Sequence, residues 1–171
     1  DLNDPVLLAQ NGLPPSEGRP QFHQQMVFAV AMRTIRLFER ALGRACMWAD
    51  MRVPADPEKR ARGGFERVRK LRIYPHALRE ANAYYSPDKV ALLFSYFRKA
   101  SETVRQDEGW VFTCLSQDIV AHETAHAILH GMQRRSVEAT NADSLAFHEA
   151  FADIVALFQH FSMKGVVEHE L

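Results

Sequence analysis

The histidines His122 and His126, in the stretch HETAH, constrain this 171-residue chain more than any other feature. Two side chains four positions apart on a helix project from the same face, so both imidazoles can reach one metal ion. Glu123 would lie close to that ion without having to bind it. In such an HExxH arrangement zinc lowers the pKa of a bound water, and the glutamate takes the proton as general base. The motif therefore predicts hydrolytic chemistry with Glu123 as the catalytic residue.

A third metal ligand is expected from a second helix. Downstream, HEAFAD places Glu149 and Asp153 four residues apart, at the start of an apolar segment that reaches Phe161. Catalytic zinc usually takes three protein ligands and keeps a position for water, so Glu149 completes a set for one zinc ion per chain. Asp153 can accept a hydrogen bond from the far nitrogen of a ligating histidine. His130 is a weaker alternative to Glu149, because a third histidine two turns after the first would stretch the geometry.

At these residues the chain resembles the thermolysin-like neutral zinc metallopeptidases, the gluzincins. That family carries HExxH on one helix and, on the next, a glutamate followed four residues later by an aspartate. The stretch Asn82-Ala83-Tyr84-Tyr85 also resembles the family's edge strand, which lies along the cleft and pairs with the substrate backbone. The resemblance covers roughly residues 22 to 161. It implies zinc-dependent cleavage of peptide or protein substrates, with Asn82 and Ala83 binding the substrate.

The chain also departs from the family pattern. The family's C-terminal helical lobe has no counterpart in these 171 residues, so the resemblance implies that this segment alone is incomplete or weakly active. The family places a tyrosine between the two zinc helices, yet no tyrosine follows Tyr96. Asp118 aligns with a calcium ligand, but His160 stands where a later glutamate is expected. The resemblance therefore gives little support for structural calcium.

Composition sets the outer limits. A chain of 171 residues with 47% hydrophobic residues is long enough for one hydrophobic core but short for two independent domains. This predicts a single domain over residues 1–171. Lysine plus arginine equals aspartate plus glutamate, at 21 each, so no net charge favours nucleic acid or anionic membranes as partners. No apolar run approaches the ~18 residues of a membrane span, and the first residues lack a signal-peptide pattern. We expect a soluble domain and leave its compartment open.

The order of elements predicts an α+β, zincin-like fold. Residues 1–20 are rich in proline and glycine, which favours an extended arm on the surface. Apolar residues at helical spacing predict a long helix over residues 21–44. Residues 70–115 form the expected sheet region, and residues 116–161 the two zinc-binding helices.

The sheet region is expected to be small and mixed or antiparallel. Its predicted strands cover residues 71–74, 82–85, 89–98 and 110–115. The turn signal Ser86-Pro87-Asp88 joins the second and third of them into a hairpin, and residues 82–85 form the edge strand.

Capping residues predict where the zinc-binding helices begin and end. Ser116 is the expected N-cap of the first, which should end at His130 because Gly131 follows. Asp143 or Ser144 is the expected N-cap of the second.

Two further histidines are expected to lie outside the site. His23, at the start of the long helix, has no second ligand four residues away, and we expect it to be exposed or to cap the helix. His148 precedes Glu149 but points about 100° away from it on a helix, so we expect solvent exposure. A second-sphere or substrate-side function of His148 is the weaker alternative.

Three interpretations remain at this stage. The chain is a zinc-dependent endopeptidase, or a zinc-binding but catalytically silent interaction or regulatory module, or a helical protein whose histidines only satisfy one another. The absent tyrosine and lobe favour the second interpretation, while the joint occurrence of three motifs favours the first. Turnover separates the first two, and metal content separates both from the third.

Overall fold

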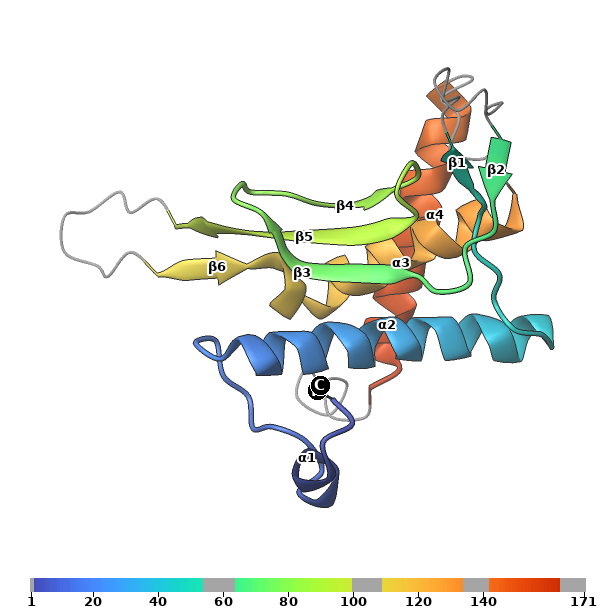
Figure 1. Ribbon diagram of the computed structural model, residues 1–171. Coiled ribbons are helices and arrows are strands. Elements are labelled where there is room, and N and C mark those ends of the chain that lie inside the picture. Colours follow the sequence, from blue (N-terminus) through green and yellow to red (C-terminus); the bar gives the residue numbers. More distant parts are fainter. Residues whose placement is uncertain (1, 54–63, 100–108, 134–141, 164–171) are drawn as a thin grey trace, which may run out of the picture.

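The computed structural model describes residues 2–53, 64–99, 109–133 and 142–163, which form a mixed α+β structure of small sheets and four helices (Figure 1). The helices are α1 (Pro5–Ala9), α2 (Pro20–Leu42), α3 (Gln117–Met132) and α4 (Ala142–Phe161), with a 3₁₀ turn η1 (Thr113–Leu115). The strands are β1 (Met51–Val53), β2 (Gly64–Glu66), β3 (Arg72–Leu78), β4 (Ala83–Ser86), β5 (Ala91–Arg98) and β6 (Trp110–Phe112).

The long helix α2 lies within two residues of its predicted bounds. Pro20 occupies its first turn, where the missing N–H costs no hydrogen bond. Gly43 ends it with φ of 66°, a left-handed conformation that glycine adopts without strain. The buried face of α2, including Val27, Val30 and Ala31, packs on the main core. In Figure 1 this helix runs below the sheet, next to β3.

The expectation of an entirely extended arm over residues 1–20 was wrong, because α1 occupies part of it. Asp4 caps this short helix by accepting a hydrogen bond from the Val6 N–H at 2.8 Å, and Pro5 begins it. None of its residues is buried. The arm is tied to α2 through Gln25, whose side chain accepts from Leu13 N–H at 2.7 Å and donates to Leu13 O at 3.1 Å.

The main sheet is mixed, with the order β3-β5-β4 and with β6 also paired to β5. β3 runs parallel to β5, whereas β4 and β6 run antiparallel to it. The predicted hairpin is confirmed: β4 and β5 pair from Ala83↔Phe94 to Ser86↔Ala91. β4 pairs with β5 alone among the described strands, so it is an edge strand as expected.

Strand β3 is longer than predicted, because it continues past Pro75. Tyr74 pairs with Leu93 and Leu78 pairs with Ser95, so four positions of β3 span two positions of β5. This irregularity is a bulge, which accommodates a proline that cannot donate to the ladder.

The predicted strand over residues 110–115 was too long. β6 ends at Phe112, and Thr113 turns the chain into η1. The Thr113 hydroxyl accepts a hydrogen bond from Ser95 N–H at 2.9 Å and donates one to Ser95 O at 3.1 Å. A side chain thus takes over the bonds that a further strand residue would make.

The two-stranded sheet of β1 and β2 was not predicted. It pairs Met51 with Glu66 and Val53 with Gly64 in antiparallel register. Three-residue strands have too few positions to show an alternating pattern, so the sequence carries little signal for them.

The main core lies between the sheet, α2 and α3. Leu92 and Phe94 of β5 are fully buried in it, together with Val120, Ala121 and Ala127 of α3. The hairpin and the HExxH helix therefore share one core, which places the β4 edge next to the motif.

The boundaries of the motif helices differ from the prediction at two points, the end of α3 and the start of α4. Ser116 caps α3 as expected, since its side chain accepts from Ile119 N–H. However, α3 continues through Gly131 to Met132. A side chain at Gly131 would place its β carbon 1.8 Å from Met47 O, so this glycine permits a close backbone approach instead of ending the helix. Asp143 and Ser144 lie inside α4 and are not its N-cap.

Among the described residues, no helix is both long and apolar enough to span a bilayer.

Candidate metal centre

The residues of the predicted metal site meet where α3 and α4 pack together. His122 and His126 project from α3, and Glu149 faces them from α4. Nε2 of His122 lies 3.3 Å from Glu149 Oε2, and Nε2 of His126 lies 3.6 Å from Glu149 Oε1. The two histidine Nε2 atoms are 3.0 Å apart. These three side chains form a group whose ligand atoms all lie within 4.8 Å of one another.

These distances fit a tetrahedral metal ion. Bonds of about 2.0 to 2.2 Å at tetrahedral angles place neighbouring ligand atoms about 3.3 to 3.6 Å apart. Both nitrogen–oxygen distances agree with that range, and the nitrogen–nitrogen distance is only about 0.3 Å shorter than its lower end. A small rotation of either imidazole would bring all three ligands into range.

Asp153 makes the contact that the sequence predicts for it. Its Oδ1 lies 2.9 Å from Nδ1 of His122, on the side of the ring opposite Nε2, the candidate metal ligand. This hydrogen bond places the proton on Nδ1 and leaves Nε2 with a free electron pair. The Asp153 side chain is 74% exposed, so its contact with His122 contributes little to the stability of the fold. The main effect of the contact is to orient the His122 ring.

Glu123 lies beside the candidate metal ligands but is not one of them. The residue is 8% exposed, and its Oε2 accepts a hydrogen bond from Tyr85 N–H of β4 at 2.7 Å. Burial raises the pKa of Glu123 to about 7, although His122 and the Tyr85 N–H both favour the charged form. A carboxyl with a pKa near neutrality can both accept and release a proton, as a general base and acid must.

Burial also keeps His126 neutral. Desolvation and the neighbouring His122 lower the pKa of His126 to about 4, so its ring carries no charge at neutral pH. Only the neutral imidazole has an electron pair to donate to a metal.

The structure corrects the expectation for His148. It is 5% exposed and not solvent-facing, and its ring stacks on His126 with a centroid distance of 5.8 Å and an interplanar angle of 14°. Its Nε2 is buried and has no hydrogen-bond partner among the described residues. His148 thus packs against His126 and lines the smaller of two hollows beside the site.

His130 does not join this group. Its Nδ1 lies 2.8 Å from the Tyr85 hydroxyl, and its ring packs edge-on against Tyr85 at 5.7 Å. His130 therefore contacts β4 through Tyr85, while Glu149 reaches the two HExxH histidines from α4.

A cleft runs along the edge of β4 past the site. Two adjoining hollows of about 450 and 300 Å³ share Ala83, His122 and Glu123 in their walls. Asn82 lines the larger hollow, and Glu149 the smaller. Both predicted substrate residues therefore lie on this cleft.

Asp118, which was compared with a calcium ligand in the sequence, contacts a histidine instead. Nδ1 of His160 lies 3.0 Å from Oδ1 of Asp118. This pair joins the ends of α3 and α4 that lie next to the cleft.

The structure also brings together a group that the sequence analysis missed. His23 is 1% exposed and contacts His76, so the expectation of an exposed or capping residue was wrong. With Cys114 these two histidines form a second set of possible metal ligands. Their positions, 53 and 38 residues apart along the chain, carry no local spacing signal.

No protein-family model, curated protein or solved structure matched this chain.

Proposed function

We propose that the chain is a zinc-dependent peptidase domain with a zincin-like fold, similar to the thermolysin-like gluzincins that its motifs resemble. One observation carries the proposal. His122, His126 and Glu149 converge with metal-ligand spacing, and the separate, buried carboxylate of Glu123 lies next to them. A site that only stored or transported metal would not require that carboxylate. One zinc ion per chain is the proposed cofactor, because a two-histidine, one-carboxylate set is typical of hydrolytic zinc.

Each residue then has a distinct function. Zinc at this position would polarise the scissile carbonyl and lower the pKa of a water molecule to near neutrality. Glu123 would accept the proton of that water as its oxygen forms a bond to the carbonyl carbon. Glu123 would then pass the proton to the nitrogen as the carbon–nitrogen bond breaks. The Tyr85 N–H holds Oε2 of Glu123 in place during both transfers.

An extended peptide fits the edge of β4. Backbone groups alternate along a strand, and Tyr85 N–H points away from β5 toward Glu123, so those of Ala83 point the same way. The Ala83 N–H is bonded to Asn82 Oδ1 at 2.8 Å, an interaction that a substrate carbonyl could replace. A peptide added antiparallel to β4 would cross the cleft within reach of Glu123.

The outer face of α4 supports the inference that a further unit packs on this helix. Four apolar side chains at helical spacing are 50 to 67% exposed there: Ile154, Leu157, Phe158 and Phe161. Contiguous apolar surface of this kind usually packs against another unit. We infer that a C-terminal helical lobe, as in the family that the motifs resemble, covers this stripe.

Hydrolysis of an unstructured protein substrate tests the proposal. The metal-free chain, the zinc-loaded chain and the zinc-loaded chain with excess chelator would be compared, using the longest form of the protein that contains residues 1–171. We expect cleavage only with zinc. Cleavage that persists in the presence of chelator would refute the proposal. Zinc binding without any cleavage would favour the silent zinc-binding module.

A further inference from the structure

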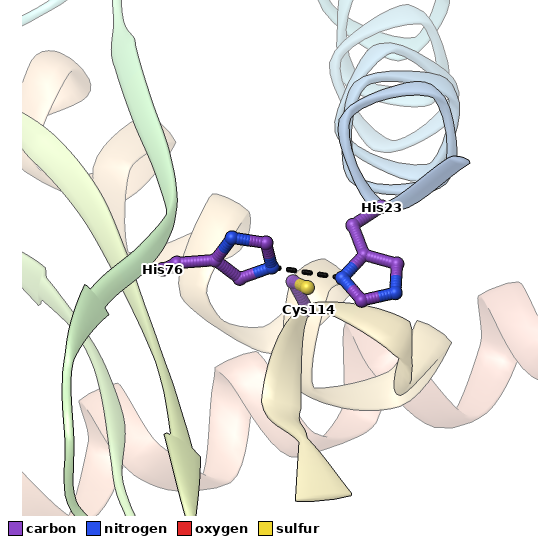
Figure 2. A group of neighbouring side chains, drawn as sticks. All are labelled: His23, His76 and Cys114. Carbon is purple, nitrogen blue, oxygen red and sulfur yellow. Dashed lines mark hydrogen bonds between the residues drawn. The ribbon is translucent and has the colours of Figure 1, made fainter. Parts of the chain in front are cut away.

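We infer that His23, His76 and Cys114 form a second metal site that binds a thiophilic transition-metal ion of the zinc class and joins α2 to the sheet (Figure 2). This inference does not depend on the proposed peptidase activity.

The three side chains come from three different elements. His23 belongs to α2, His76 to β3 and Cys114 to η1. Their candidate ligand atoms lie within 4.8 Å of one another, the same limit that the His122–His126–Glu149 group meets. In Figure 2 the sulfur of Cys114 lies next to the line that joins the two imidazoles. Two imidazoles and one thiolate are a ligand set that suits zinc and copper.

The hydrogen bonds of His23 match those of a metal ligand. Its Nε2 lies 2.8 Å from Glu17 O, and a carbonyl can only accept, so Nε2 carries the proton. Nδ1 of His23 then presents its electron pair toward His76 Nε2, 2.8 Å away. The far nitrogen of a ligating histidine is commonly bound to an oxygen acceptor in this manner. His122 shows the same arrangement at the first site, with Asp153 as the acceptor.

The short nitrogen–nitrogen distance also recurs at the first site. The closest imidazole nitrogens are 2.8 Å apart here and 3.0 Å apart in the HExxH pair. Tetrahedral coordination needs about 3.3 Å, so a metal ion would have to separate the two rings by about half an ångström. His76 can supply this movement, because it is exposed whereas His23 and Cys114 are buried.

Local backbone structure holds each ligand in position. His76 lies in the bulge between Tyr74 and Leu78, and its ring packs against the rings of His23 and Tyr96. Cys114 follows Thr113, whose hydroxyl is bonded to both backbone groups of Ser95. Phe112 packs against both imidazoles, with ring centroids at 4.5 and 5.4 Å, and so supplies an apolar wall.

Burial favours the neutral form of both His76 and Cys114. Burial and the neighbouring His23 lower the pKa of His76, so its imidazole is neutral and able to bind metal. Burial raises the pKa of the Cys114 thiol to about 11. A bound metal ion must therefore displace the thiol proton, as it does at other thiolate sites.

The absorption spectrum of bound Co²⁺ tests the second site through a signal that the first site cannot produce. Co²⁺ replaces zinc in tetrahedral sites, and only a thiolate ligand adds a sulfur-to-metal charge-transfer band in the near ultraviolet. The first site has nitrogen and oxygen ligands alone. The metal-free full chain would be titrated with Co²⁺ and then with Zn²⁺. We expect the band to appear with Co²⁺ and to disappear as Zn²⁺ displaces it, with about two zinc ions bound per chain at saturation.

Matched variants assign the band. Cys114→Ser should abolish the charge-transfer band. His76→Gln should weaken Co²⁺ binding by at least about 10-fold, because loss of a residue that only hydrogen-bonds to a metal ligand already lowers the affinity by about that factor. Because His76 is exposed, the His76→Gln protein should fold even if the substitution of the buried Cys114 prevents folding. Cys46→Ser is the control, because Cys46 is the other cysteine of the chain and lies outside the group. A His122→Ala/Glu149→Gln double variant should keep the band and lose the other zinc ion.

Three results would contradict the second metal site. Absence of the band in the parent protein, or its persistence in Cys114→Ser, would overturn the second site. So would unchanged Co²⁺ affinity in His76→Gln. In each case His23 and His76 would be a hydrogen-bonded pair without a metal. A protein that lacks hydrolytic activity but shows the band would refute the proposed function and leave the second site intact.

Discussion

The backbone N–H of Tyr85 donates a hydrogen bond to Oε2 of Glu123 at 2.7 Å. This contact joins the edge strand β4 directly to the carboxylate of the HExxH motif. The strand that would bind an extended substrate thus also orients the proposed general base. A shift of β4 would move both together, which couples substrate position to proton transfer.

Glu123→Gln should remove hydrolysis and preserve metal binding. The amide keeps the size of the side chain but cannot accept the proton, so we expect activity to fall by roughly 10²- to 10⁴-fold. Zinc content should stay at the parental value, because Glu123 lies outside the ligand group. Glu66→Gln, on the exposed strand β2 and outside both hollows of the cleft, is the matched control. Parental activity in Glu123→Gln would rule out the proposed base.

Glu149→Gln should weaken zinc binding more than any change outside the ligand group. The amide loses the negative charge that faces the two Nε2 atoms at 3.3 and 3.6 Å. We expect zinc affinity to fall by more than the roughly 10- to 100-fold that is typical when a residue hydrogen-bonded to a metal ligand is removed. Competition with a chromophoric chelator gives the affinity, and Glu66→Gln on the exposed strand β2 is the control. Unchanged affinity would return His130 to consideration as the third ligand.

Asp153→Asn should have an intermediate effect. The amide oxygen can still accept from His122 Nδ1, but without the charge that strengthens the bond. We expect zinc affinity to fall by roughly 10- to 100-fold, with measurable binding left. The same competition assay applies, and the variant should rank between the parent protein and Glu149→Gln. A larger loss than in Glu149→Gln would indicate that Asp153 itself binds the metal.

Gly131→Ala should destabilise the fold, although alanine favours helices by about 1 kcal/mol over glycine. The added β carbon would lie 1.8 Å from Met47 O, and backbone cannot rotate away as a side chain can. We expect a net loss of about 1 to 3 kcal/mol in the free energy of unfolding, measured by urea denaturation. Gly18→Ala, where a β carbon would meet nothing within 4 Å, should change stability by less than about 0.5 kcal/mol. Equal stability of both variants would contradict the close approach.

Local spacing in the sequence predicted the part of the site that lies on helices. Helix geometry places residues four positions apart on one face, whatever the rest of the fold does. His122 with His126, and Glu149 with Asp153, were therefore predictable as pairs. The β4–β5 hairpin was also predictable, because its turn residues lie between two short apolar strands. Zinc binding and catalysis at these residues stay predictions.

Tertiary structure alone decided the features that join distant parts of the chain. The parallel pairing of β3 with β5, the burial of His148 and the meeting of His23, His76 and Cys114 depend on packing between separate elements. Gly131 reads as a helix end in the sequence, yet its position is explained by Met47, 84 residues earlier. When a single residue contacts another element, no regular spacing of residues along the sequence indicates that contact. The physical reason is that local spacing constrains only residues on the same element, while contacts between elements follow from how the whole core packs.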